Sequence, residues 1–100
     1  MDISKIKKGT FLTFKNDSNL YNIYLVAKRA PTISDDTVKI FTSMTHICER
    51  NGEYVTTDSF KNPYEFKRNE LDQKLEFTDQ ATIDKIQKAF EKNGRNVNEF

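Results

Sequence analysis

The sequence has few of the residues from which metal centres and disulfide frameworks are built. Its 100 residues include one cysteine, Cys48, one histidine, His46, and no tryptophan. A single cysteine excludes an internal disulfide framework and suits a reducing compartment. Because a structural zinc site needs four ligands and a catalytic one usually three, aspartate or glutamate would have to complete any site built on this pair. We expect no metal and no cofactor.

Long apolar runs and phosphate-binding motifs are missing as well. No run approaches the ~20 residues of a membrane span, and the start, MDISKIKKG, has no apolar core behind its lysines. We therefore expect a cytosolic protein that does not bind membranes. The glycines are scattered, and neither GxGxxG nor GxxxxGK occurs, so the sequence offers no loop that would cradle a phosphate group.

A strong charge of one sign is absent too. Sixteen basic and fifteen acidic side chains leave a net charge of +1, which is too small to draw the whole molecule to nucleic acid. The charge is nevertheless uneven. Residues 1–30 carry a balance of +4, residues 31–60 carry −3, and the remainder is neutral. The sequence therefore allows a local basic patch.

What is present favours a small folded domain. Hydrophobic residues make up 36% of the chain, and eight Phe and four Tyr supply the large apolar surfaces that disordered chains lack. At this length the chain has room for one core, so we expect a single domain over residues 1–100. We expect residues 1–8 and 95–100 to be flexible.

Two strands are predicted in the first third of the sequence. The first runs from Thr10 to about Lys15 and is closed by turn-forming residues at 16–19. The second, LYNIYLVAKR, covers residues 20–29 and ends before Pro31, because proline has no N–H to donate to a ladder. Both of its faces are partly apolar, as happens in a small closed or covered sheet. One face carries Tyr21, Ile23, Leu25 and Ala27, and the other carries Tyr24 and Val26.

A polar loop at residues 32–36 leads to a third strand over residues 37–44 and then to a hairpin. Asn51 and Gly52 can adopt the positive φ angles of a type I′ turn. That turn predicts cross-strand pairs of Arg50 with Glu53, Glu49 with Tyr54, and Cys48 with Val55. The same register places Met44, His46, Cys48 and Val55 on one face, which we take as the inward face.

The segment after the hairpin is less regular. Pro63 interrupts it, and three aromatic side chains, Phe60, Tyr64 and Phe66, could cover one end of a barrel. Residues 71–77, LDQKLEF, alternate apolar and polar side chains, which predicts a last strand. Leu71 and Leu75 also fit helical spacing, so a helix is the alternative.

Residues 78–93 predict an amphipathic helix. Thr78 or Asp79 is a suitable N-cap, and Asn93 with Gly94 supplies a left-handed stop. Lysines lie toward the end of the helix, where its dipole favours positive charge. We expect the apolar stripe to cover an open end of the sheet. The stripe consists of Ile83, Ile86, Ala89 and Phe90.

Together these elements predict a mainly β (α+β) fold. We expect a small SH3-like barrel or a strongly bent antiparallel sheet of about five or six strands, with one C-terminal helix packed on it. Three stretches resemble a loose group of small proteins from Bacteroides-type bacteria and their phages or mobile elements. They are the lead IKKGTFLTFK, the tyrosine-rich second strand, and the terminal TDQATIDKIQKAFEKNG. The resemblance implies an SH3-like barrel closed by a C-terminal helix, in a group mostly without an assigned function.

His46 and Cys48 are the first candidates for chemistry. Side chains two apart on a strand point the same way, so the pair could form an activated nucleophile or half of a metal site. The alternative, which we favour, is that Cys48 packs opposite Val55 as a small buried hydrophobe while His46 lies at the core margin. The acidic candidates Asp35, Asp36 and Asp58 lie in turn or cap sequences, which favours ordinary solvated residues over metal ligands or an acid–base pair.

The remaining candidate is a binding surface in which aromatic side chains lie beside basic ones. Such a surface can bury against a protein partner, or it can stack bases and hold phosphates. We therefore predict a non-enzymatic protein-binding module, encoded by a phage or mobile element and acting as an inhibitor or regulator. The alternatives are a nucleic-acid-binding accessory protein and, third, a low-turnover enzyme. The predicted surface consists of Tyr24 (or Tyr21), Tyr54, Tyr64, Phe60, Lys7, Lys8, Lys28 and Arg29.

Overall fold

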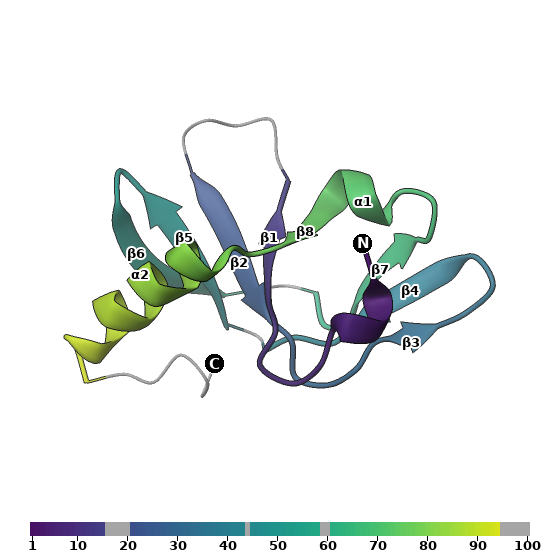
Figure 1. Ribbon diagram of the computed structural model, residues 1–100, viewed down its shortest axis with the longest axis horizontal. Helices are drawn as coiled ribbons and strands as arrows, with labels where there is room; N and C mark the ends of the chain where they lie inside the picture. The colour runs from purple at the N-terminus through teal and green to yellow at the C-terminus, as the bar shows by residue number, and fades with distance from the viewer. Residues whose placement is uncertain (16–20, 44, 59–60, 95–100) are drawn as a thin grey trace.

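The computed structural model describes residues 1–15, 21–43, 45–58 and 61–94 (Figure 1). Within these ranges the chain forms eight β-strands, two α-helices and one short 3-10 helix. In chain order they are η1 (Ile3–Lys5), β1 (Phe11–Phe14), β2 (Asn22–Val26), β3 (Thr32–Ile33), β4 (Thr37–Ile40), β5 (Thr45–Arg50), β6 (Glu53–Asp58), β7 (Tyr64–Lys67), α1 (Leu71–Lys74), β8 (Leu75–Phe77) and α2 (Gln80–Glu91). In this part of the chain, no helix has the length and apolar character needed to cross a membrane.

The strands form two antiparallel sheets. The larger sheet has the order β6-β5-β2-β1-β8, and the smaller has the order β3-β4-β7. An isolated bridge between Ala27 and Thr42 joins the segments that follow β2 and β4. Figure 1 shows α2 beside the larger sheet at one end of the molecule, and η1 beside the smaller sheet at the other.

The larger sheet is covered on both faces. Successive side chains of its strands point to opposite sides, so each face contributes to a core cluster of its own. One core cluster joins it to the smaller sheet, and the other joins it to α2. The two-faced apolar pattern predicted for the second strand is therefore confirmed. Buried members of the first cluster include Leu12, Leu25, Val38, Ile40 and Leu75. Buried members of the second are Phe11, Tyr24, Val26, Ile47, Ile86 and Phe90.

The predicted mainly β fold with a C-terminal helix is confirmed in its bent-sheet form. Among the described residues the sheets do not close into a barrel, since β6 and β8 stay at opposite edges of the larger sheet. The chain leaves the sheet after β8 and enters α2, which packs on one face of the larger sheet. Residues 32–36, expected as a loop, contain the short strand β3, whose Thr32 and Ile33 pair with β4.

The β5–β6 hairpin has the predicted register, with Arg50 opposite Glu53 and Cys48 opposite Val55. Both turn residues have positive φ, 55° at Asn51 and 81° at Gly52. The predicted inward face is wrong in part. His46 is buried, but Cys48 is only half-buried and Val55 is 52% exposed. The core residue of β5 on the other face is Ile47, which α2 covers. Met44 lies outside the described residues.

The stretch LDQKLEF is not a continuous strand. Its first four residues form the helical turn α1, and only Leu75–Phe77 pair with β1 as β8. Leu71 and Leu75 are both buried, because the turn brings residues four apart to one side. Both expectations for this stretch therefore hold over part of its length. Tyr64 and Phe66 lie half-buried in β7 against the first core cluster, and Phe60 is outside the described residues.

α2 follows its predicted pattern. Asp79 is the N-cap, since its Oδ1 accepts a hydrogen bond from the Thr82 backbone N–H at 2.9 Å. Ile86 and Phe90 are buried, and Gly94 follows the helix with a φ of 70°. Residues 1–8, expected to be flexible, include η1 and the buried Ile6, whereas residues 95–100 lie outside the described part.

Truncating the helix side chain at the centre of the second core cluster should destabilise the protein. We expect Ile86→Ala to lower the free energy of unfolding by about 2–5 kcal/mol, because the space it leaves is enclosed by the sheet. Urea unfolding followed by circular dichroism measures this. The exposed Glu91→Ala on the same helix should change it by less than about 0.5 kcal/mol. Equal effects of the two substitutions would contradict the placement of α2 on the sheet.

Candidate functional site

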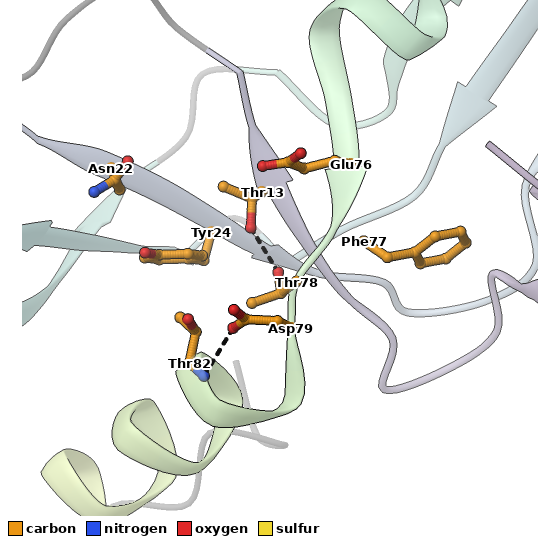
Figure 2. Close-up of a pocket in the computed structure, with 8 residues that line it drawn as sticks. All are labelled: Thr13, Asn22, Tyr24, Glu76, Phe77, Thr78, Asp79 and Thr82. Carbon is orange, nitrogen blue, oxygen red and sulfur yellow. Dashed lines mark hydrogen bonds between the residues drawn. The ribbon is translucent and has the colours of Figure 1, made fainter.

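A polar hollow of about 310 Å³ opens where α2 begins beside the larger sheet (Figure 2). Phe77 borders it, but its ring points away from the other labelled side chains in Figure 2. The hollow therefore offers hydrogen-bonding groups rather than an apolar pocket. The residues that line it with hydroxyl or carboxylate groups are Thr13, Tyr24, Glu76, Thr78, Asp79 and Thr82.

Hydrogen bonds fix several of these groups in place. The hydroxyl oxygens of Thr13 and Thr78 lie 2.8 Å apart. Hydrogen bonds from Thr82, with the side chain contributing more than the backbone N–H, lower the pKa of Asp79. Asp79 is therefore a carboxylate at neutral pH. This end of the hollow is a preformed acceptor region beside the start of α2.

A second hollow, of about 510 Å³, lies further along α2, between the helix and the β5–β6 hairpin. Tyr54 and Glu49 line it from the hairpin. On the helix side it is lined by Lys85, Lys88 and Lys92, which we call the lysine wall. These lysines are three and four residues apart, so they share one stripe of the helix. The second hollow thus combines an aromatic ring with three ammonium groups.

The two hollows are neighbours along α2, and we call them together the α2 trough. Asn22 of the first hollow donates a hydrogen bond from its Nδ2 to Glu49 Oε2 of the second at 2.8 Å. The ring centroids of Tyr24 and Tyr54 are 6.3 Å apart, a tilted arrangement within the favourable range for aromatic pairs. The trough is therefore acidic near the start of α2 and basic toward its end, with two tyrosines between.

Glu49 connects the trough to the hairpin turn. Its Oε1 accepts a hydrogen bond from the backbone N–H of Gly52 at 2.9 Å, while Oε2 accepts the one from Asn22. The bond from Asn22, and to a smaller extent that from Gly52, lowers the pKa of Glu49. This carboxylate holds the turn against β2, so it serves the shape of the trough.

The tyrosine pair is held rigidly. Tyr24 is only 7% exposed and belongs to the second core cluster, and Tyr54 is half-buried against that cluster. Burial, followed by the proximity of Tyr54, Glu49 and Asp79, raises the pKa of Tyr24 to about 12. Burial also raises the pKa of Tyr54, with Glu49 and Asp79 adding to the effect. Both phenols are therefore neutral across the physiological range.

The predicted surface residues do not form a single site. Tyr24 and Tyr54 meet in the α2 trough, but Tyr64 lies in β7, and Phe60 is outside the described residues. Two of the basic members line another hollow. Lys8 and Lys28 line a space of about 230 Å³ beside Gly9, and Lys7 is exposed one residue before Lys8. Arg29 places its guanidinium carbon 3.6 Å from the centre of the Phe41 ring.

The lysine wall was missed by the sequence reasoning. The signal was present, because a spacing of three and four residues puts the three lysines on one side of a helix. That pattern was explained by the helix dipole alone. The sequence could not show that Tyr54 lies beside these lysines, because Tyr54 is 31 positions from Lys85 along the chain.

Within the described residues, His46 hydrogen-bonds to Tyr64 and not to Cys48, since its Nδ1 is buried without a partner. The His46 imidazole Nε2 lies 2.9 Å from the Tyr64 hydroxyl, and the two rings are tilted at 34° with centroids 5.5 Å apart. His46 is 4% exposed, so it bridges β5 of the larger sheet to β7 of the smaller one inside the protein. Among the described residues, no group of three or more His, Cys, Asp or Glu side chains is placed to hold a metal ion.

Comparison of the chain with protein-family models, with curated proteins and with solved structures finds no match. The resemblance to small Bacteroides-type and mobile-element proteins therefore stays a prediction.

Stability should fall on mild acidification because of His46. Burial lowers the pKa of its imidazole below the ordinary value of 6.5, while the Thr45 backbone acts weakly the other way. Well above pH 6.5 the imidazole is neutral in both states. As the pH drops through that value the unfolded chain takes up the proton first, so the free energy of unfolding decreases until the folded pKa is reached.

Urea unfolding between about pH 5 and pH 8 measures this loss, which the non-titrating variant His46→Gln should lack. The carboxylates with lowered pKa values, Asp2, Glu49 and Asp79, titrate at lower pH and contribute little in this window. NMR titration of the single histidine reports its pKa directly. An imidazole pKa at or above 6.5 in the folded protein would contradict the burial of His46.

Proposed function

We propose that the protein is a non-enzymatic protein-binding module that engages its partner through the α2 trough. The observation that carries this proposal is the Tyr24–Tyr54 pair, which forms the middle of the trough and is backed by the core. Tyrosine is common at interfaces because it combines a large apolar body with a polar tip. A ring already held by packing loses little side-chain entropy on binding. Tyr54, the partly exposed member of the pair, suits an anchor point for a partner, and the buried Tyr24 supports its ring from behind.

The protonation states in the trough support a binding role over catalysis. General acid–base catalysis works best with a group whose pKa lies near the operating pH. Asp79 and Glu49 have lowered pKa values, and the pKa of Tyr24 is raised to about 12, so all three are displaced away from neutrality. Asp79 accepts its hydrogen bond from Thr82, and Glu49 accepts from Asn22 and Gly52, so both carboxylates are parts of the scaffold.

The second candidate function is nucleic-acid binding. The lysine wall beside Tyr54 favours it, because ammonium groups can pair with phosphates while an aromatic ring stacks a base. Against it, Glu49 lies in the same hollow, and Glu76 and Asp79 make the other end of the trough acidic. A protein partner with both acidic and basic side chains matches the two ends better.

The resemblance of the chain's two ends to mobile-element proteins supports a regulatory version of this function. In that version the protein is a phage or mobile-element inhibitor related to SH3-like domains, and it acts in the cytosol by occupying a surface of a host or element protein. The rigid trough and its charged rim would supply affinity and orientation.

Reversing charge on the lysine wall should abolish partner capture without unfolding the protein. We expect the Lys88→Glu/Lys92→Glu double variant to lose a partner that the wild type retains from a lysate of its source cells, since Lys88 on α2 and Lys92 at its C-cap both have exposed side chains. The matched control Lys7→Glu/Lys8→Glu makes the same change of charge outside the trough, in the predicted basic patch, and should retain the partner. Circular dichroism checks that all variants fold.

A second measurement separates the two candidate functions. Fluorescence anisotropy with short single- and double-stranded DNA and RNA, at low and moderate salt, tests for nucleic acid. Binding that falls steeply with salt and is lost in the Lys88→Glu/Lys92→Glu variant would favour the nucleic-acid function. Loss of protein capture in the Lys7→Glu/Lys8→Glu variant alone would place the binding site outside the trough.

A further inference from the structure

Strand β6 is an outer edge of the larger sheet in the described part of the chain. Its pairing with β5 is unbroken over six residue pairs. In a hairpin with a two-residue turn, the pair that flanks the turn, Arg50 and Glu53, is hydrogen-bonded, and such pairs alternate along the ladder. The backbone N–H and C=O groups of Tyr54, Thr56 and Asp58 therefore point away from β5. They form a row of donors and acceptors that suits another strand.

This edge lacks most of the devices that keep natural edges from pairing. From Glu53 to Asp58 it has no proline, no lysine and no bulge. It does have an acidic residue at each end. In a symmetric antiparallel pair of two copies centred on Thr56, Tyr54 of one copy would face Asp58 of the other, because only residues whose N–H and C=O groups point outward can pair directly. Asp58 would then be the one acidic side chain that β6 of the second copy brings to the face carrying Tyr54. A different chain with several acidic side chains on this face matches the lysine wall better.

The side chains on the two faces of β6 define what that chain should carry. On one face Tyr54 borders the second hollow with the lysine wall, which favours acidic side chains. On the other face Val55 is 52% exposed and pairs with the half-buried Cys48, which favours apolar side chains. Because an added strand points successive side chains to opposite faces, it meets the two environments alternately.

We propose that β6 accepts an extended segment of a partner protein as an additional strand, with acidic side chains toward the lysine wall and apolar side chains over Val55. This rests on the proposed protein-binding function and narrows it to strand addition. Main-chain hydrogen bonds to Tyr54, Thr56 and Asp58 give affinity, and the alternation of side chains gives specificity.

The test uses the full chain and a defined peptide of about eight residues in which glutamate and valine alternate. A peptide with lysine in place of glutamate and a scrambled peptide of the same composition are the matched controls. Amide hydrogen exchange measured by NMR is the readout. We expect the amides of Tyr54, Thr56 and Asp58 to exchange rapidly in the free protein and to become protected by the alternating acidic peptide alone.

Two variants protect the edge by different means. Thr56→Pro removes an outward N–H without touching the ladder to β5, and Val55→Lys places a charge on an exposed position. We expect each variant to lower the affinity for the peptide by at least about tenfold. If one variant fails to fold, the other still provides the test. Lys88→Glu should lower the affinity for the acidic peptide, whereas the distant Lys8→Glu should leave it unchanged.

The outcomes separate strand addition from the broader function. One outcome is a protein partner that binds the Thr56→Pro and Val55→Lys variants normally but not the Lys88→Glu/Lys92→Glu variant. This outcome would overturn strand addition and leave the protein-binding function intact. If the wild-type protein captures no protein partner at all, both strand addition and the protein-binding function are overturned. Amides of β6 that are already protected in the free protein would also overturn the proposal. If the protection of these amides depends on protein concentration, a second copy occupies the edge. If it persists at every dilution, another segment of the same chain occupies it.

Discussion

The fold depends on the need to cover β2 twice. Its residues alternate between apolar side chains that point to opposite faces, so neither face can be left in water without exposing a large hydrophobic area. The smaller sheet covers one face through Val38 and Ile40, and α2 covers the other through Ile86 and Phe90. The order of layers follows from this one strand.

The candidate site is a consequence of the same arrangement. A helix that crosses a twisted sheet cannot contact all of it equally, and hollows remain where their surfaces diverge. Tyr24 belongs to the core and also lines the first hollow. The hydrogen bonds of Glu49 to Asn22 and Gly52 then fix the hairpin beside it. The trough is thus formed by groups that the fold has already immobilised.

Local patterns in the sequence predicted the elements whose signals are local. The Asn51–Gly52 turn fixed the β5–β6 register, and Asp79 with the Ile83–Phe90 stripe fixed α2, because turn geometry and helical spacing act within a few residues. The inward face of the hairpin could not be predicted, since it depends on how far the smaller sheet extends over β5. LDQKLEF was ambiguous because Leu71 and Leu75 fit both periods. The lysine wall beside Tyr54 is a tertiary pairing, which no local pattern encodes.

The double role of Tyr24 also limits how the trough could diversify over generations. A substitution there would reduce stability and alter the surface at once, so it would be selected against for two separate reasons. Lys85, Lys88 and Lys92 carry no such burden, because their ammonium groups lie outside the core. New partners would therefore be acquired by substitutions in the lysine wall, while Tyr24 stayed unchanged.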